Sequence, residues 1–225
     1  MTQIDSIRKR LTLSQRRVFP VVIQELGMNI TINEGVFPPH DLEQWRWLAE
    51  NFPPVAGKRV LEIGCGAGLP GLYLAKCSAL SLLACDIDPK AVRNTLENAE
   101  RNDIRNVEVI QSDIFSNVPP NRKFDIIFWN YPWIFAPDDY TYRDDLERGA
   151  IDPGYRVLRR FLSEGTEFLT ASGRIVLSFA SGARDDLFLE AIAENDLACV
   201  LFASGTYPYV SHIYRMFCIQ KNVKP

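Results

Sequence analysis

Five short runs of apolar residues recur along the middle of the chain, at about 58–63, 80–85, 106–110, 124–129 and 173–179. Runs of this kind are typical of strands that are buried on both faces of a parallel sheet. Segments with helical spacing separate them, at about 69–77, 89–102, 151–171 and 184–195, and the second opens on the helix-start pair Asp88-Pro89. A succession of strand, helix and strand predicts right-handed crossovers between parallel strands.

The last part of the chain follows a different pattern. Two apolar runs, at about 197–204 and 211–220, are joined by a six-residue loop at 205–210, which has no room for a crossover helix. Such a pair predicts an antiparallel hairpin at the edge of the sheet. We therefore expect an α/β fold with a doubly wound, mostly parallel sheet of seven strands and a reversed terminal hairpin.

The first 57 residues lack this regular alternation. A helical pattern at about 3–16 is followed by two short apolar stretches around Gly27, a turn at 35–39 and a helix at about 40–51, in which His40 is expected to act only as a cap. The segment is too short for a large core of its own. We expect residues 1–57 to form an extension over the mouth of the sheet, as a lid, and residues 58–225 to form the main domain.

Composition narrows the class of protein. A length of 225 residues fits one domain, and five cysteines without a C-x-x-C pair are expected to be reduced thiols and not a metal site. The net charge of −3 makes nucleic acid an unexpected partner. No apolar run is long enough to span a bilayer, and the first residues lack a signal-peptide pattern. We expect a cytoplasmic protein without a membrane partner.

The strongest chemical signal follows the first predicted strand, which runs directly into Gly64, Gly66 and Gly68. Closely spaced glycines allow the backbone, here including Cys65, to approach a ligand closely. Glu62 at the end of the strand adds negative charge where the pyrophosphate of a dinucleotide would lie. The loop therefore favours a ligand that carries a positive charge or hydroxyl and amine donors.

Acidic residues follow the next two predicted strands. Asp86 is placed to accept hydrogen bonds from both hydroxyls of a ribose. Asp113 is placed to accept from an exocyclic amine, while Ile114 covers an aromatic base. Taken singly, an acid at such a position is more often a helix cap or a loop residue than a ligand-binding group. Their order along the chain points to a nucleoside ligand.

The ordered series VLEIGCGAG, CDID, QSDIF and FDIIFWNYPW resembles the class I methyltransferases that use S-adenosylmethionine, over about residues 35–220. This resemblance implies a Rossmann-like sheet in a domain, residues 58–225, that binds S-adenosylmethionine and carries out catalysis. It implies that the methionine end is held by the glycine loop, the ribose by Asp86, and the adenine by Asp113 with Ile114. The glycine-loop residues concerned are Glu62, Gly64, Cys65, Gly66 and Gly68.

The segment Asn130-Tyr131-Pro132-Trp133 resembles the Asn-Pro-Pro-aromatic motif of methyltransferases that act on planar nitrogens, such as the methyltransferase small domain and release-factor glutamine methyltransferases. The resemblance implies that Asn130 and a proline carbonyl accept hydrogen bonds from an NH2 group, on which an aromatic ring stacks. We expect catalytic roles for Asn130, Tyr131 and Trp133, with Asn130 also near the cofactor. The segment Gly35-Val36-Phe37-Pro38 resembles the short segment that closes over the ligand in this group, which implies that Phe37 contacts the cofactor.

One position departs from the motif, because Tyr131 replaces its first proline and introduces a ring where a planar substrate would stack. The larger N-terminal domain of release-factor enzymes and the basic balance of ribosomal RNA enzymes are not seen. We therefore expect transfer of a methyl group to a nitrogen of a small molecule or amide.

Several aromatic residues are expected near the mouth of the site. They are Tyr131, Trp133, Phe135, Tyr140, Tyr142, Tyr207 and Tyr209. Loop packing is the favoured role of Phe135, Tyr140 and Tyr142, whereas Tyr131 and Trp133 are expected beside the sulfonium cation, which attracts ring faces by about 0.5–2 kcal/mol per contact. If aromatic rings fill the pocket, a second reaction becomes possible. S-adenosylmethionine would then cyclise without an acceptor, release methylthioadenosine and form azetidine-2-carboxylate. A third hypothesis, a binding subunit without activity, ranks last because every motif residue is present.

Overall fold

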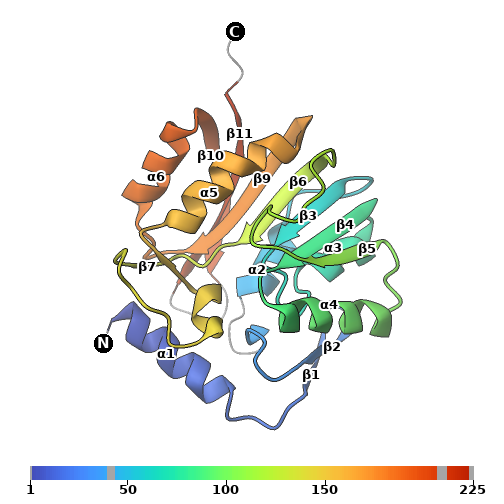
Figure 1. The fold of residues 1–225 in the computed structure, drawn as a ribbon. Helices are drawn as coiled ribbons and strands as arrows, with labels where there is room; N and C mark the ends of the chain where they lie inside the picture. The colour runs from blue at the N-terminus through green and yellow to red at the C-terminus, as the bar shows by residue number, and fades with distance from the viewer. Residues whose placement is uncertain (1, 40–43, 207–211, 223–225) are drawn as a thin grey trace.

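The computed structural model describes residues 2–39, 44–206 and 212–222 (Figure 1). Its centre is a seven-stranded sheet in the order β10-β11-β9-β6-β3-β4-β5. The strands are β3 (Arg59–Ile63), β4 (Ser81–Asp86), β5 (Val107–Gln111), β6 (Phe124–Asn130), β9 (Leu169–Ala180), β10 (Leu197–Thr206) and β11 (Ile213–Lys221). The pairs from β5 to β9 are parallel, whereas β11 is antiparallel to both of its neighbours. The predicted sheet and its reversed terminal hairpin are confirmed.

Helices cover both faces of this sheet (Figure 1). They are α2 (Gln44–Asn51), α3 (Gly71–Cys77), α4 (Pro89–Arg101), α5 (Arg156–Gly165) and α6 (Asp185–Glu194). Successive strand residues point to opposite faces, so Val60 joins the core under α2, α3 and α4 while Leu61 joins the core under α5 and α6. The helix start predicted for α4 is confirmed, because the Asp88 side chain accepts a hydrogen bond from the Lys90 backbone N–H at 2.8 Å.

The helix predicted over 151–171 is wrong at its beginning and end. Residues Ile151–Pro153 form β8, which pairs in parallel with the short strand β7 (Ile134–Ala136). Gly154 and Tyr155 then have φ angles of +60° and +53°, a left-handed conformation that a right-handed helix does not contain. The chain therefore turns before α5 begins, and β9 already starts at Leu169 after the 3-10 turn η3 (Thr166–Phe168).

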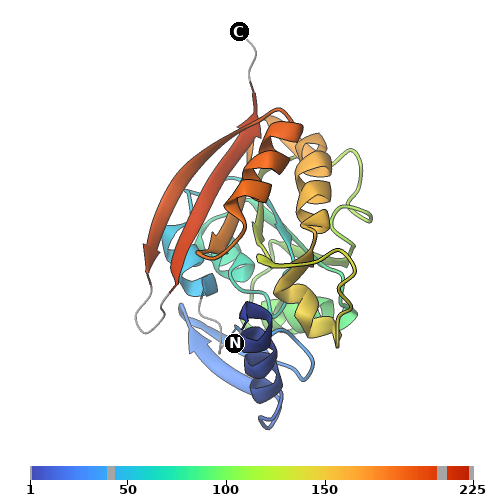
Figure 2. The ribbon, with the colours of Figure 1, turned by 90° about the vertical axis from the view of Figure 1, so that its left-hand side faces the viewer.

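The N-terminal segment consists of helix α1 (Gln3–Ser14) and the antiparallel hairpin of β1 (Val21–Glu25) and β2 (Met28–Ile32). Figure 2 shows α1 and this hairpin together at the end of the molecule that lies away from the C-terminus. The inward side chains of β2 belong to the same hydrophobic cluster as one face of the sheet. Residues 40–43, with His40, lie outside the described residues. The role of residues 1–57 as a lid stays a prediction.

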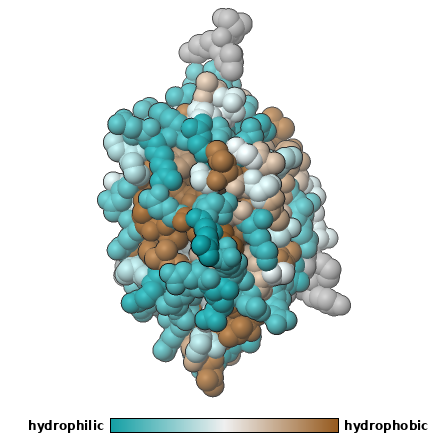
Figure 3. Space-filling model, turned by 90° about the vertical axis from the view of Figure 1, so that its right-hand side faces the viewer, coloured by the Kyte–Doolittle hydropathy of each residue, from teal (hydrophilic) through white to brown (hydrophobic). Residues whose placement is uncertain are grey.

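Two general features bear on the function. Each described helix is too short or too polar to cross a membrane, and the face shown in Figure 3 is mostly hydrophilic, with hydrophobic residues gathered near its middle. All five cysteines carry free thiols. Within the described ranges, no three His, Cys, Asp or Glu side chains come together as a metal site.

Candidate functional site

The predicted site residues gather at the carboxyl ends of β3, β4 and β6. Because β3 pairs with both β4 and β6, the crossovers on its two sides diverge and leave a crevice at this edge. Two adjoining cavities occupy it, one of about 540 Å³ and one of about 240 Å³. Four residues line both cavities: Phe37, Asn130, Pro132 and Gly149.

The glycine loop forms part of the wall of the larger cavity, which Gly64, Cys65 and Gly66 line. Gly64 has a φ angle of +69°, and a Cβ there would lie 2.9 Å from Nε1 of Trp129. A Cβ on Gly66 would meet no atom within 4 Å, so the loop is open to a ligand at that residue. Gly68 does not line either cavity, and a Cβ there would meet the side chain of Leu72 in α3.

Glu62 lies behind this loop and does not line either cavity. Its side chain is buried, and its Oε1 accepts a hydrogen bond from the backbone N–H of Gly71 at 3.2 Å. A Cβ on Gly71 would overlap the Glu62 carboxyl group, so the glycine is needed for this close approach. Burial raises the pKa of Glu62 well above its usual range. A direct contact between Glu62 and the methionine end stays a prediction.

The acids after β4 and β5 both line the larger cavity. Asp86 accepts hydrogen bonds from the backbone N–H groups of Gly66 at 2.9 Å and Asp88 at 3.0 Å, and burial raises the pKa of its carboxyl group. Asp113 is half exposed and pairs with Arg160 at 2.9 Å. Ile114 is buried and has a φ angle of +52°. The structure therefore brings the predicted ribose and adenine residues to one cavity.

The Asn130 side chain lies on the wall between the two cavities. Its Oδ1 atom is buried and accepts no hydrogen bond from the described residues. A buried carbonyl oxygen without a hydrogen-bond donor costs free energy. Such atoms are therefore rare in folded proteins, and a role in binding or catalysis is one reason why they are kept. Trp133 lines the smaller cavity, and its backbone carbonyl accepts a hydrogen bond from the Tyr155 hydroxyl at 2.6 Å.

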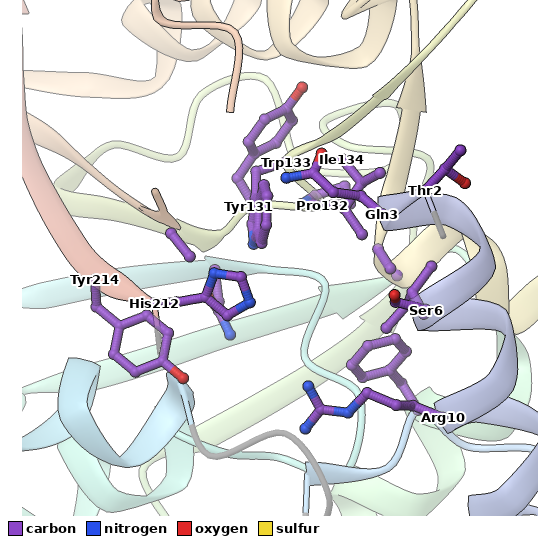
Figure 4. Close-up of a pocket in the computed structure, with 16 residues that line it drawn as sticks. Thr2, Gln3, Ser6, Arg10, Tyr131, Pro132, Trp133, Ile134, His212 and Tyr214 are labelled. Carbon is purple, nitrogen blue, oxygen red and sulfur yellow. The ribbon is translucent and has the colours of Figure 1, made fainter. Parts of the chain in front are cut away.

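Tyr131 does not fill the site as its sequence position suggests. The side chain is buried, and its hydroxyl donates a hydrogen bond to Asp152 Oδ2 at 2.8 Å. Figure 4 shows this hydroxyl turned away from the side chains of Arg10 and His212. Tyr131 lines the smaller cavity together with Asn130, and space remains between them and the other lining residues.

The other aromatic residues lie in different surroundings. Tyr142 lines the larger cavity under the guanidinium of Arg148, which lies 4.6 Å from the ring centroid. Tyr140 donates a hydrogen bond to Glu147, and Phe135 packs against Tyr155, so neither lines the cavities. Tyr207 and Tyr209 lie outside the described residues.

Sequence reasoning missed several residues of the site. Trp129 lines the larger cavity beside Gly64, and Arg160 lines it beside Asp113. One wall of the smaller cavity comes from α1 and its N-cap residue, and Figure 4 shows Thr2, Gln3, Ser6 and Arg10 on it; Ile7 lines the cavity as well. Trp129 was detectable as the neighbour of the Asn130 motif. No local pattern points from α1 to a segment 120 residues further along the chain.

Comparison with known proteins agrees with this geometry. A family model described as Methyltransferase small domain matches residues 27–194. The chain belongs to this family. It is a methyltransferase of the class I fold that uses S-adenosylmethionine, which confirms the enzyme class and cofactor that the motifs imply.

Two relatives are named for glutamine methylation. A protein of Methanocaldococcus jannaschii, provisionally named a protein N5-glutamine methyltransferase, is 32% identical over 172 residues, which cover 74% of this chain and 84% of that protein. The release factor glutamine methyltransferase of Haemophilus influenzae is 31% identical over 134 residues, which cover 53% of this chain and 45% of that protein.

A solved structure shows the same fold at lower identity. The T. thermophilus 16S rRNA N2 methyltransferase, in complex with AdoMet and guanosine, aligns with a TM-score of 0.62 and 21% identity, over 90% of this chain and 50% of that chain.

The residues of the larger cavity fit S-adenosylmethionine. The glycine loop leaves open space at Gly66, and Asp86 offers carboxylate oxygens at the end of β4. The methyl donor carries hydroxyl and amine groups that donate hydrogen bonds, together with a sulfonium cation. Acceptors and acids therefore suit it better than the basic groups that a pyrophosphate needs.

Proposed function

We propose that this protein methylates the side-chain nitrogen of a carboxamide that enters the smaller cavity. The observation that carries the proposal is the unpaired Oδ1 atom of Asn130, on the wall that both cavities share. S-adenosylmethionine supplies a methyl group activated by its sulfonium. The glutamine methyltransferase names of two relatives support an amide as the acceptor.

The chain's residues then have distinct roles in holding the donor. Asp86 accepts from the ribose hydroxyls, and Asp113 with Ile114 holds the adenine. The backbone of Gly64 and Gly66 lies against the methionine end. Phe37, which lines both cavities, separates this ligand from solvent.

An amide nitrogen is a weak nucleophile because its lone pair is delocalised into the carbonyl group. Oδ1 of Asn130 and the carbonyl oxygen of Pro132 accept hydrogen bonds from the NH2 group and stabilise the positive charge that develops on nitrogen. Trp133 stacks on the amide plane. Holding the nitrogen in line with the methyl group lowers the barrier further, so the site needs no strong base.

The charge of the smaller cavity indicates which class of acceptor it binds. Among the described residues that line the smaller cavity, Arg10 is the one that carries a full charge. The larger cavity is lined by four aspartates and two arginines, and its acids outnumber its bases: Asp86, Asp88, Asp113, Asp145, Arg148 and Arg160. Opposite charges favour association, so a carboxylate near the reacting amide favours binding beside Arg10. We therefore propose a glutamine-type acceptor that carries a nearby negative charge.

Cyclisation of the donor was the alternative for a pocket filled by aromatic rings. The described residues favour transfer over cyclisation, because Tyr131 is bonded to Asp152 and a cavity of about 240 Å³ adjoins Asn130. The complete set of motif residues likewise speaks for a working enzyme and against a subunit that only binds.

Product analysis tests the proposal. The protein is incubated with S-adenosylmethionine and either N-acetylglutamine, which is anionic, or N-acetylglutamine methylamide, which is neutral. We expect S-adenosylhomocysteine and the N-methylated amide to form together, faster with the anionic acceptor. Methylthioadenosine in the absence of acceptor would overturn the proposal in favour of cyclisation.

Substitution of Asn130 gives a second test. Asn130→Ala should abolish the methylated product and leave the S-adenosylmethionine affinity within a few-fold of the wild type. Asn195→Ala is the control, because this asparagine bonds only the end of α6, through the Ala191 carbonyl at 2.8 Å. An active Asn130→Ala variant would contradict the assigned role.

A further inference from the structure

Three asparagines, two in α4 and one at its C-cap, hydrogen-bond to the backbone of the β2 segment. Asn94, Asn98 and Asn102 are spaced four residues apart, so they lie on one face of the helix. Four helical residues rise about 6 Å and two strand residues about 6.6 Å, so the asparagines keep step with every second residue of the strand.

The bonds follow this register. Oδ1 of Asn102 accepts from the N–H of Asn29 at 2.8 Å, and Oδ1 of Asn98 accepts from the N–H of Thr31 at 2.8 Å. Oδ1 of Asn94 accepts from the N–H of Asn33 at 3.0 Å. All three Nδ2 groups donate to carbonyl groups of the same segment. The side chains of α4 thus take the place of a neighbouring strand at this edge of β2.

Asn98 makes one bond that its neighbours lack. Its Nδ2 donates to the Thr31 carbonyl at 2.7 Å and also to the Ala67 carbonyl in the glycine loop at 2.8 Å. The side chain is fully buried, and both of its N–H donors and its oxygen are used. One turn earlier, the Thr95 hydroxyl donates to the Gly66 carbonyl at 3.0 Å. Two successive carbonyl groups of the loop are therefore fastened to α4.

We propose that Asn98 is a positioning residue for S-adenosylmethionine binding, because it fixes the glycine loop and the β2 segment relative to one another. The backbone N–H of Gly66 donates a hydrogen bond to Asp86, so the loop conformation also fixes the position of the Asp86 carboxyl group, the proposed acceptor for the ribose hydroxyls. Six residues after Thr31 the chain reaches Phe37, which lines both cavities. Binding of the donor and the order of this N-terminal segment are therefore coupled through one side chain. This inference rests on the cofactor and not on the proposed acceptor.

The test compares Asn98→Ala with Asn94→Ala. Asn94 is also fully buried and makes hydrogen bonds to Thr31 and Asn33, but none to the glycine loop. Titration calorimetry with S-adenosylmethionine should show affinity at least 10-fold weaker for Asn98→Ala and within 3-fold of the wild type for Asn94→Ala. Equal affinities of the two variants would overturn the proposal.

Hydrogen exchange tests the coupling directly. S-adenosylmethionine should slow amide exchange in residues 28–33 of the wild type and of Asn94→Ala, and should fail to do so in Asn98→Ala. Protection of these amides by the donor in Asn98→Ala would contradict the inference.

A second variant covers the case in which Asn98→Ala does not fold. Thr95→Val removes the hydroxyl that bonds Gly66 and leaves every bond to β2 in place. We expect its affinity for S-adenosylmethionine to fall at least 3-fold, and an unchanged affinity would overturn the role of this attachment. A wild-type protein that binds no S-adenosylmethionine would overturn the cofactor itself, whereas donor binding without amide methylation would affect only the proposed function.

Discussion

The ring of Phe37 lies so close to the backbone of Gly149 that a Cβ on Gly149 would come within 2.5 Å of Phe37 Cδ2. The two residues stand 112 positions apart in sequence and both line both cavities. The N-terminal segment and the 3-10 helix η2 (Asp145–Gly149) therefore meet where the two cavities join.

Adding a methyl group at this contact should disturb the site more than the fold. Gly149→Ala should displace the Phe37 ring and weaken S-adenosylmethionine binding about 10-fold, measured by calorimetry. The smaller side chain of Phe37→Leu should restore much of the affinity in the double variant, because coupled neighbours are not additive. Full affinity in Gly149→Ala alone would show that the ring can move without cost.

The bond between Tyr131 and Asp152 should contribute to stability. Asp152 is fully buried and also accepts from the backbone N–H of Leu158 at 2.9 Å, so Tyr131→Phe removes one of several donors to a buried carboxyl group. We expect the free energy of unfolding in urea to fall by about 1–2 kcal/mol while donor affinity is unchanged. Tyr73→Phe, at a partly buried position where the hydroxyl bonds the exposed thiol of Cys77, is the control and should change stability by less than about 0.5 kcal/mol. An equal loss in both variants would argue against the role of this bond.

Acid pH should weaken the contacts that hold α1 against η2, because they include the carboxyl group of Glu147. Burial raises the pKa of Glu147, but hydrogen bonds from Arg8 at 2.7 Å, Tyr140 and the Arg143 N–H outweigh it, so the pKa lies below its ordinary value of 4.5. A lowered carboxyl pKa gives stability that is present above 4.5 and is lost as the pH falls through the folded-state pKa.

Glu147→Gln isolates this contribution. The variant should be less stable than the wild type at pH 7, and the difference should shrink as the pH falls below 4.5. Urea unfolding at several pH values measures it, and a difference that stays constant down to the lowest pH would contradict the prediction.

The charge of Arg10 should act on the acceptor alone. Arg10→Gln should raise KM for N-acetylglutamine about 5-fold to 10-fold, leave kcat similar, and leave the kinetics of the neutral methylamide unchanged. Lys9→Gln is the control, because Lys9 is exposed on the same helix and lines neither cavity. The effect should weaken at high salt, since exposed charges are screened. Equal changes for both acceptors would rule out a charge interaction.

The sequence predicts the sheet well because the central strands β3, β4 and β6 are largely buried and leave continuous apolar runs, and the end of β10 and the start of β11 are too close for a helix. The run at 106–110 was expected to be buried on both faces, but β5 lies at the edge of the sheet and is only partly buried. It misses β7 and β8, because strands of three residues carry no readable pattern. The helix predicted over 151–171 fails for a local reason, the left-handed turn at Gly154 and Tyr155.

Candidate site residues were predictable where one strand end positions them. Asp86 and Asn130 end the parallel strands β4 and β6, and Asp113 follows β5; the carboxyl ends of these strands meet at one edge of the sheet. Arg10 and Gly149 reach the same place through contacts between distant segments, which spacing along the chain does not encode. The catalytic role of Tyr131 stays a prediction, but its bond to Asp152 was not predictable, because Asp152 belongs to a strand that the sequence does not reveal.

The three asparagine side chains that bond α4 and its C-cap to β2 also restrict where this chain can gain or lose residues. Each residue turns a helix by about 100°, so a single insertion between Asn94 and Asn98 would rotate the side chains of Asn98 and Asn102 away from β2. The hairpin would then expose an unpaired edge, a surface that invites aggregation. Insertions should therefore be tolerated in the loops around α4 and not within it.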